Sequence, residues 1–177
     1  RNRALLYIIV KDYEKAEADY TKAIELEPEN DENYYDRGNF YRNYLEDNDK
    51  AIADFTKAIE LDPVDAYNYF ERGDAYAYNE QYNEALASYL KAEELDKDKS
   101  LAKSEGLYTN MAVVFDELEQ NDKVVEYITK EIEIKPDYSL GYRNRALLYR
   151  RVKDYEKAEA DYTKAIELDP ENDENYY

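Results

Sequence analysis

Residues 66–97 read AYNYFERGDAYAYNEQYNEALASYLKAEELDK, and this stretch decides the fold. Aromatic and small residues recur in both halves of it at the spacing i, i+4 and i+7, which places them on one face of an α-helix. They are Tyr69, Gly73 and Tyr76 in the first half, and Ala85, Tyr89 and Ala92 in the second. Residues 79–82 between the halves leave room only for a tight turn, so the stretch predicts two antiparallel helices.

The same design recurs along the chain. The matching positions in residues 31–65 are Tyr34, Gly38, Tyr41, Ala51, Phe55 and Ala58, and those in residues 139–172 are Tyr142, Ala146, Tyr149, Ala158, Tyr162 and Ala165. We expect the small residues to let the helix backbones approach closely, while the aromatic residues fill the space around them. Proline ends the second helix at Pro63 and Pro170, because it cannot continue a helix.

Two levels of repetition set the boundaries of the units. Residues 1–35 recur as residues 143–177 with three differences, Ile8 against Arg150, Ile9 against Arg151 and Glu27 against Asp169. The prolines at positions 28, 63, 136 and 170 are 35, 73 and 34 residues apart, which are one, two and one periods of about 35 residues. The predicted units are therefore 1–30 (truncated), 31–65, 66–104, 105–138 and 139–172, with 173–177 opening a further unit.

A two-helix unit cannot bury its own apolar face, so neighbouring units must stack. Runs of alternating apolar and polar residues, the mark of strands, are absent from the sequence. We therefore expect an all-α fold, a single α-solenoid of antiparallel helix pairs over residues 1–177. Because the sequence starts and stops inside units, we also expect it to be a piece excised from a longer array.

The 34-residue period and its aromatic, small and proline positions resemble the tetratricopeptide repeat. In residues 66–97 the matching positions are Tyr69, Gly73, Tyr76, Ala85, Tyr89 and Ala92, with Lys97 in place of the usual proline. The sequence departs from the family pattern at Arg37 and Arg72, where an apolar residue is usual, and at Glu131, where a small one is. It also carries one extra residue near 44–49 and about five extra near 99–104, which we expect to lengthen a helix or loosen a turn.

The resemblance implies a right-handed superhelix whose first helices line a concave groove that binds an extended peptide or a helix of a partner protein. The groove candidates that it implies are Tyr35, Asn39, Arg42, Phe70, Asp74, Tyr78, Asn110, Arg143, Asn144 and Arg150, with Thr109, Val113, Asp116, Leu147 and Arg151 at further positions of the same kind.

Three chemistries compete for this groove. The Lys, Asn and Arg clamp with which some family members hold a terminal carboxylate is missing, since Tyr35, Glu71 and Gly106 stand at its positions. Aromatic faces and amides would instead suit a peptide backbone or an apolar anchor. A basic cluster of Arg143, Arg145, Arg150 and Arg151 could hold a phosphate, or could simply pair with acidic residues such as Asp154 and Glu156. For any single position, a solvated polar helix face remains the plainer alternative.

Composition excludes several other functions. The chain has neither Cys nor His, only 4 Gly and a net charge of −19, so thiol or imidazole catalysis and a glycine-rich phosphate loop are ruled out. The acidic charge disfavours nucleic acid, and no apolar run is long enough to cross a membrane. Acidic pairs such as Glu93 and Glu94 arise by chance among 43 carboxylates, so we predict no enzyme activity, no metal and no cofactor.

The sequence thus predicts a protein–protein interaction scaffold that takes a protein or peptide partner. The alternative is a structural spacer that self-associates by stacking end to end without a groove ligand. Ile8 and Ile9 favour that alternative, because they form an apolar spot where the duplicated segment 143–177 has Arg150 and Arg151. The absence of Cys removes evidence for an oxidising compartment but does not fix the compartment, and among the alternatives we favour the cytoplasm.

Overall fold

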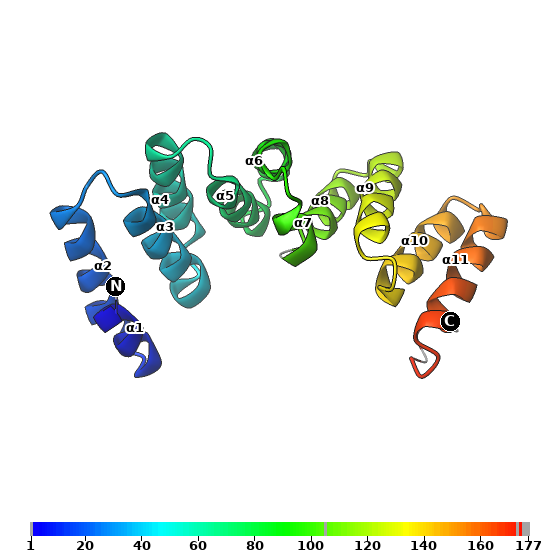
Figure 1. Cartoon of the computed structure of the whole chain (residues 1–177), viewed down its shortest axis with the longest axis horizontal. Helices are drawn as coiled ribbons and strands as arrows, with labels where there is room; N and C mark the ends of the chain where they lie inside the picture. Colours follow the sequence, from blue (N-terminus) through cyan, green and yellow to red (C-terminus); the bar gives the residue numbers. More distant parts are fainter. Residues whose placement is uncertain (1, 105, 173, 175–177) are drawn as a thin grey trace. The chain divides into compact units, whose positions relative to one another are not determined.

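A computed structural model describes residues 2–104, 106–172 and 174, and it is helical throughout (Figure 1). Within these residues there is no β-strand. The helices are α1 (Asn2–Ile9), α2 (Tyr13–Leu26), α3 (Asp31–Phe40), the π-helix η1 (Tyr41–Leu45), α4 (Asn48–Leu61), α5 (Ala66–Tyr78), α6 (Tyr82–Leu95), α7 (Ser100–Ser104), α8 (Leu107–Glu117), α9 (Asn121–Ile134), α10 (Ser139–Arg151) and α11 (Tyr155–Leu168).

The helices form two compact units, Arg1–Lys97 with α1 to α6 and Asp98–Tyr177 with α7 to α11. In each unit the helices pack as antiparallel pairs, α1 with α2, α3 with α4, α5 with α6, α8 with α9 and α10 with α11 (Figure 1). The predicted all-α solenoid of helix pairs is confirmed. The predicted single array over residues 1–177 stays a prediction, and its opening of a further unit at 173–177 lies outside the described residues, apart from Glu174.

Polar side chains cap the first turn of five of the described helices, α2, α3, α4, α5 and α11. Asp12 caps α2 by accepting from the Lys15 backbone N–H at 3.3 Å, and Asp47 caps α4 by accepting from Lys50 at 3.1 Å. Such caps satisfy backbone donors that the first turn of a helix leaves free. Asp65 caps α5 in the same way through the Tyr67 N–H at 2.9 Å.

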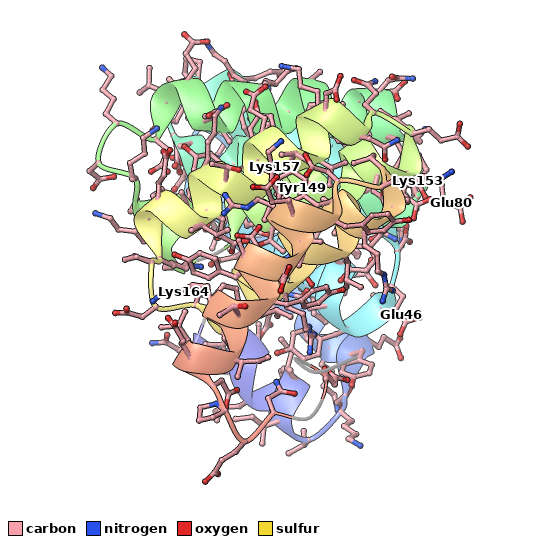
Figure 2. All side chains as sticks on the ribbon, turned by 90° about the vertical axis from the view of Figure 1, so that its right-hand side faces the viewer. Glu46, Glu80, Tyr149, Lys153, Lys157 and Lys164 are labelled. Atoms are coloured by element: carbon pink, nitrogen blue, oxygen red, sulfur yellow. The ribbon has the colours of Figure 1, made fainter. Side chains whose placement is uncertain are left out.

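The turn inside each helix pair is closed by one residue in the left-handed conformation, with φ between 53° and 65°. These residues are Lys11, Glu46, Glu80, Glu119 and Lys153. Figure 2 labels three of them, Glu46, Glu80 and Lys153. A left-handed residue reverses the chain within a few residues, which is why the short turns produce antiparallel neighbours.

Small residues sit where helices approach most closely. A Cβ on Gly38 would lie 2.8 Å from the Phe55 ring, and one on Gly73 would lie 2.6 Å from the Tyr89 ring. Both rings are buried, at 0% and 1% exposure. The first unit also has a continuous core of such contacts, made of Ala4, Ile8, Ala16, Tyr20, Phe40, Tyr41, Ala51, Phe55 and Ala75.

The extra residue expected near 44–49 is accommodated as a π-helix. Tyr41–Leu45 winds with one residue more per turn than an α-helix, so the added residue is absorbed without disturbing the α3–α4 pair. The spacing of a contact that recurs along the chain records the insertion. Arg145 reaches Asp161, 16 residues on, whereas Arg37 reaches Asp54, 17 residues on.

The five-residue insertion near 99–104 differs from both outcomes that we expected. It neither extends α6 nor leaves a loose turn, but forms the separate short helix α7, Ser100–Ser104. Two left-handed residues permit this, Lys99 with φ 61° before the helix and Gly106 with φ 74° after it. Leu101 and Ala102 bury their side chains, at 0% and 2% exposure, so packing holds the insertion in place.

No helix in the described part of the chain combines the length and the apolar character needed to cross a membrane. The longest helices have 14 residues, and each carries several charges.

Candidate functional site

The first helices of the first unit bring together three of the predicted groove residues. Arg42 forms ion pairs with Glu71 at 2.5 Å and with Asp74 at 2.9 Å. The Tyr35 hydroxyl donates to Glu71 at 3.4 Å, and the Tyr89 hydroxyl donates to Asp74 at 2.6 Å. The Arg42 guanidinium is thus held by two carboxylates of α5, and it ties α3–η1 to α5.

Tyr35 lies at the buried edge of this cluster. Burial, followed by the nearby Glu71 carboxylate, raises the pKa of Tyr35 to about 12. Asn39 and Arg42 oppose the rise, the first by a hydrogen bond and the second by its positive charge. The phenol therefore stays neutral at ordinary pH and serves as a hydrogen-bond donor.

Of the other three candidates of the first unit, Asn39 is half-buried on α3, and the remaining two lie at opposite extremes of exposure. Phe70 is 3% exposed, and its ring lies 6.0 Å from that of Tyr89. It is a packing residue, which corrects the expectation that it faces a groove ligand. Tyr78 is 74% exposed and borders a pocket of about 450 Å³ together with Arg42, Asn43, Glu46 and Asn48.

In the second unit the predicted groove positions converge on one open pocket of about 530 Å³. It lies among α8, α9 and α10. Its lining residues are Thr109, Ala112, Val113, Asp116, Val124, Ile128, Glu131, Asn144, Leu147, Leu148, Arg150 and Arg151. Seven of these twelve were named from the sequence as positions of the inner helix faces, namely Thr109, Val113, Asp116, Asn144, Leu147, Arg150 and Arg151.

The pocket has an apolar floor and a polar rim. Val113 on α8 and Leu147 on α10 are 57% and 40% exposed, although both are large aliphatic residues. Val124 and Ile128 of α9 back them, at 3% and 6% exposure. Exposed aliphatic side chains gathered in a concavity are a feature of binding sites, because a solvated surface gains nothing from them.

Glu131 departs from the repeat pattern and fills a polar role in this pocket. It is 3% exposed, accepts a hydrogen bond from the Thr109 hydroxyl, and pairs with Lys135 at 3.7 Å. The small residue of other units is therefore replaced by a carboxylate that links α9 to α8. Such a buried acceptor is stable only because it has a hydrogen-bond partner.

The basic cluster of the last pair does not gather into an anion site. Arg145 donates to Asp161 at 2.7 and 2.8 Å, and Arg151 pairs with Asp116 at 2.5 Å. Arg143 pairs with Glu174. These carboxylates differ from Asp154 and Glu156, the partners that we expected, but the outcome is the same, because most of the positive charge is already neutralised.

Two more candidates stand apart from the pocket. Asn110 is half-buried on α8, and Arg143 is half-buried on α10, but neither lines the pocket. Asn144 and Arg150 do line it.

The predicted packing positions are mostly inside the helix pairs. Those that are buried are Gly38, Tyr41, Ala51, Phe55, Ala58, Tyr69, Gly73, Ala85, Tyr89, Ala92, Ala146, Ala158 and Ala165. Those that are half-buried are Tyr34, Tyr76, Tyr142, Tyr149 and Tyr162. Tyr149 makes a cation–π contact, since the Lys157 ammonium lies 5.2 Å from its ring centre (Figure 2).

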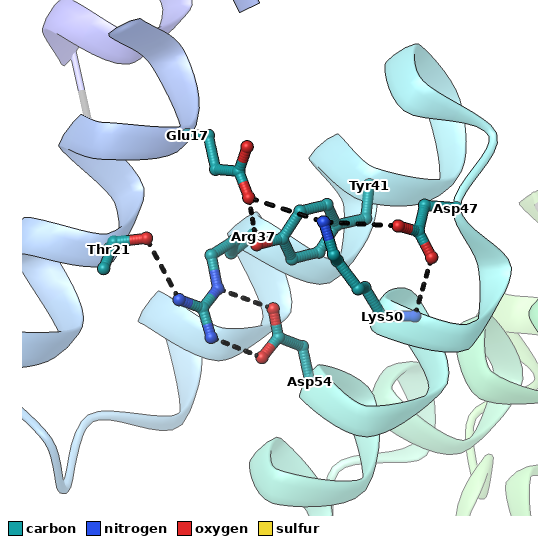
Figure 3. Close-up of polar contacts among 7 residues, drawn as sticks. All are labelled: Glu17, Thr21, Arg37, Tyr41, Asp47, Lys50 and Asp54. Carbon is teal, nitrogen blue, oxygen red and sulfur yellow. Dashed lines mark hydrogen bonds and ion pairs between the residues drawn. The ribbon is translucent and has the colours of Figure 1, made fainter. Parts of the chain in front are cut away.

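Sequence reasoning missed a polar network that joins successive pairs. Arg37 on α3 donates to Asp54 of α4 at 2.7 and 2.8 Å and to the Thr21 hydroxyl of α2 at 3.2 Å (Figure 3). Beside it, the Tyr41 hydroxyl donates to Glu17 of α2 at 2.8 Å. A signal was present, because the arginine stands where the repeat pattern has an apolar residue.

The described residues contain no group of three acidic side chains arranged to hold a metal ion. Glu94 belongs to one of the acidic pairs considered for acid–base chemistry, and it accepts a hydrogen bond from the Lys91 ammonium at 2.9 Å. The chemistry that this arrangement offers is recognition by apolar contact and hydrogen bonding.

Comparison with known proteins gives a consistent picture of the family. Models described as "Tetratricopeptide repeat" match residues 1–30 and 139–172, residues 31–65 and residues 55–87. Over 99 residues, 56% of the chain, it is 32% identical to the "DnaJ homolog subfamily C member 7 homolog" of Dictyostelium discoideum. Over 94 residues, 53% of the chain, it is 29% identical to the "Protein STIP1 homolog" of the same organism.

A third curated relative is an enzyme. The chain is 35% identical over 65 residues, 37% of its length, to the "UDP-N-acetylglucosamine--peptide N-acetylglucosaminyltransferase" of Giardia intestinalis. The matches span only 4%, 18% and 16% of the three relatives, so each likeness concerns a small part of a much longer protein.

Solved structures share the fold at low sequence identity. MamA superposes with a TM-score of 0.83 at 23% identity, covering 94% of each chain. PilF of Pseudomonas aeruginosa gives 0.75 at 18% identity, covering 98% of this chain and 77% of that one. YrrB, described as "a TPR protein with an unusual peptide-binding site", gives 0.57 at 22% identity, covering 89% of this chain and 95% of that one.

Proposed function

Since the chain belongs to the tetratricopeptide repeat family, we propose that it is an interaction scaffold that binds a partner peptide in the pocket among α8, α9 and α10. The observation that carries this proposal is the exposure of Val113 and Leu147 inside a concavity of about 530 Å³. A volume of this size accommodates one or two apolar side chains of a peptide.

The rim of the pocket suits the backbone of such a peptide. Thr109 and Asn144 stand beside the apolar floor. The Asn144 amide can both donate to and accept from peptide groups, whereas the Thr109 hydroxyl, which donates to Glu131, can accept. Asp116 and Arg151 neutralise each other, so the rim carries little net charge. An apolar anchor with hydrogen bonds along its flanks is therefore the partner that the pocket fits best.

The charge of the whole chain adds a preference for the flanks of the peptide. With a formal net charge of −19, the protein repels acidic partners and attracts basic ones, which raises the rate of encounter more than the final affinity. We therefore propose a peptide with an apolar anchor and neutral or basic flanks. Its binding should weaken as salt screens the attraction.

The test is selection of peptides from a random 12-residue display library on the immobilised chain, followed by fluorescence polarisation with the selected sequences. We expect an apolar consensus residue, and at least a tenfold loss of affinity in the Leu147→Asp and Val113→Asp variants. Val64→Asp is the matched control, because Val64 is also exposed, at 71%, but lies in the α4–α5 connection of the other unit.

Two results would contradict the proposal. One is a library that yields no binding peptide, and the other is a set of selected peptides whose affinity is the same for Leu147→Asp as for Val64→Asp. Circular dichroism of each variant checks that the helices are intact, so that a lost affinity reports on the pocket and not on folding.

A further inference from the structure

One buried carboxylate in the pocket among α8, α9 and α10 uses only part of its capacity to accept hydrogen bonds. Glu131 lines this pocket and is 3% exposed. Its Oε1 atom accepts from the Thr109 hydroxyl and lies 3.7 Å from the Lys135 ammonium. Its Oε2 atom accepts from no group in the described part of the chain. A carboxylate has about four acceptor positions, so this side chain can take a further donor.

The Oε2 atom of Glu131 is open to the pocket. It is not one of the wholly enclosed polar atoms that lack a partner in the described residues, so it keeps contact with solvent. Because Glu131 is almost completely covered and lines the pocket, the pocket is where a ligand can reach this oxygen. A largely buried acceptor gains free energy from a donor, and a ligand that brings none forfeits that gain.

The carboxylate continues the apolar stripe of α9. Val124, Ile128 and Glu131 follow one another at the spacing i, i+4 and i+7, so they lie along one face of the helix. All three line the pocket, and Glu131 stands about one helical turn beyond Ile128. A ligand group that packs on Val124 and Ile128 can therefore place its far end at the carboxylate.

The fold itself does not require a carboxylate at this position. Ala58, Ala92 and Ala165 stand at the same position in three other helix pairs, and each of them is 0% exposed. Alanine thus completes the packing of the helix pair without any polar group. Glutamate at position 131 places a charge where the other pairs have a methyl group, and burying a charge is costly. Recognition of a ligand gives this costly replacement a purpose.

The charges around Glu131 favour a neutral donor over a cationic one. Lys135 already pairs with this carboxylate, and Arg150 and Arg151 add positive charge to the lining. Asp116 is the one other acidic residue of the lining, and it pairs with Arg151. An ammonium or guanidinium group that enters the pocket would therefore meet like charges, which is unfavourable. A hydroxyl group supplies a donor without that cost.

The chain contains two examples of a hydroxyl that meets a carboxylate in a covered setting. The Tyr41 hydroxyl donates to Glu17 at 2.8 Å, and the Tyr89 hydroxyl donates to Asp74 at 2.6 Å. The two tyrosines are 6% and 1% exposed, so their rings are buried while their hydroxyls reach a carboxylate of another helix. Tyrosine combines an apolar body with one polar group at its far end, which matches both the apolar floor and Glu131.

We propose that the anchor of the bound peptide is a tyrosine, whose ring packs on Val113, Ile128 and Leu147 and whose hydroxyl donates to Oε2 of Glu131. This inference rests on the proposed function, since it names the side chain that fills the proposed pocket. Phenylalanine would fill the same volume but would leave the carboxylate without the donor. A site built to bond a hydroxyl discriminates against an analogue that lacks it. Glu131 is thus the residue that determines specificity.

The test is a set of parallel selections from the 12-residue display library, on the unmodified chain and on variants of position 131. Glu131→Ala introduces the residue of three other helix pairs, so the helices should fold, which circular dichroism checks. Glu131→Gln keeps the size of the side chain but replaces one acceptor oxygen by a donor group. Glu133→Ala is the matched control, because it removes the same charge from the same helix at an exposed position that does not line the pocket.

We expect tyrosine as the consensus anchor on the unmodified chain and on Glu133→Ala, and leucine or phenylalanine on Glu131→Ala. Fluorescence polarisation with the selected peptide should show an affinity about tenfold lower when its tyrosine is replaced by phenylalanine. Replacement by lysine should cost more, because of the positive charges at the pocket. On Glu131→Ala and Glu131→Gln, the tyrosine and phenylalanine peptides should bind with affinities within about twofold of each other.

Three outcomes would overturn this inference and leave the proposed function standing. The first is an anchor other than tyrosine on the unmodified chain. The second is a tyrosine-to-phenylalanine loss that is as large on Glu131→Ala and Glu131→Gln as on the unmodified chain, which would assign the hydroxyl to another partner. The third is a lysine peptide that binds more tightly than the tyrosine peptide. A library that yields no peptide, or peptides insensitive to Leu147→Asp, would contradict the proposed function and this inference together.

Discussion

Arg145 and Asp161 face each other across the α10–α11 pair through two parallel hydrogen bonds, Nε to Oδ2 at 2.7 Å and Nη2 to Oδ1 at 2.8 Å. Their duplicates Arg3 and Asp19 make the same two bonds across the α1–α2 pair. The surroundings differ, because the Arg145 side chain is 17% exposed and that of Arg3 is 71% exposed. The carboxylates are about equally buried, at 10% and 13% exposure, so the two otherwise identical ion pairs differ in whether the guanidinium is covered.

The first prediction compares these two pairs. Asp161→Ala should lower the free energy of unfolding by about 3 kcal/mol, because it leaves a largely buried guanidinium without its carboxylate. Asp19→Ala should have a much smaller effect, since water solvates Arg3 when its partner is lost. Urea unfolding of the two variants measures the difference. Equal losses would mean that coverage by α9 does not strengthen the Arg145–Asp161 pair.

The second prediction concerns the closest helix contact. Gly73→Ala should destabilise the first unit by about 1 to 3 kcal/mol, because the new Cβ would lie 2.6 Å from the Tyr89 ring. That ring is 1% exposed, and its hydroxyl is bonded to Asp74, so it has little freedom to move away. Gly141→Ala is the milder comparison, since its Cβ would meet Ile132 at 3.1 Å. Thermal melting that ranks Gly141→Ala as the worse variant would contradict this packing argument.

These contacts show how far the sequence predicts the fold. The i, i+4, i+7 pattern of Tyr69, Gly73 and Tyr76 was enough to predict the helix pair, because helix packing needs small residues at close contacts and this need is local in the sequence. Phe70 lies beside that pattern and was misjudged. Its burial at 3% depends on neighbouring helices, which the local spacing does not reveal.

The lining of the candidate pocket could be anticipated where it follows from the repeat geometry, and not where it depends on the partners of individual side chains. Leu147 and Val113 were identified as inner-face residues, and both line the pocket. The arginine network was missed, because Arg37 and Arg72 were treated only as departures from an apolar position. Their hydrogen bonds to Thr21 and Thr56 join one helix pair to the preceding pair. The sequence pattern within one repeat unit does not predict a contact between two units.

The third prediction concerns the left-handed turn between α10 and α11. Lys153 has φ 65°, a conformation that costs residues other than glycine roughly 1 kcal/mol. Lys153→Gly should therefore leave stability unchanged or raise it slightly, and Lys153→Val should lower it, because a β-branched side chain tolerates this region poorly. Melting temperatures of the two variants make the comparison. A valine variant as stable as the glycine variant would mean that the turn has relaxed to another conformation.

The fourth prediction is loss of stability in alkali. Because burial raises the pKa of Tyr35 to about 12 from an ordinary value of 10.0, the folded phenol keeps its proton where the unfolded one has lost it. Between these values the unfolded state binds fewer protons, so stability falls as pH rises from about 10 to about 12. Burial and the hydrogen bond to Glu17 raise the pKa of Tyr41 as well, which acts in the same direction.

Melting temperature measured from pH 8 to pH 11.5 tests this effect. Tyr35→Phe should flatten the decline above pH 10, since phenylalanine has no proton to lose in either state. Tyr78→Phe is the control, because Tyr78 is 74% exposed. If both variants lose stability along the same curve as the unmodified chain, the alkaline transition has another origin.

The fifth prediction isolates the contact that sets the stacking register. Thr129→Val removes the hydroxyl that accepts from Arg145 at 3.0 Å, and it should cost about 1 kcal/mol. Thr163→Val removes the same hydroxyl from a helix on which no described arginine donates to it. Both substitutions also remove an equivalent bond to a backbone carbonyl, to Val125 in one case and Glu159 in the other, so that loss cancels in the comparison. Urea unfolding should therefore show a clear loss of stability for Thr129→Val and little change for Thr163→Val. Equal losses of stability in the two variants would mean that the lost bond to the backbone carbonyl causes the effect. The arginine–threonine contact would then not determine how the helix pairs stack.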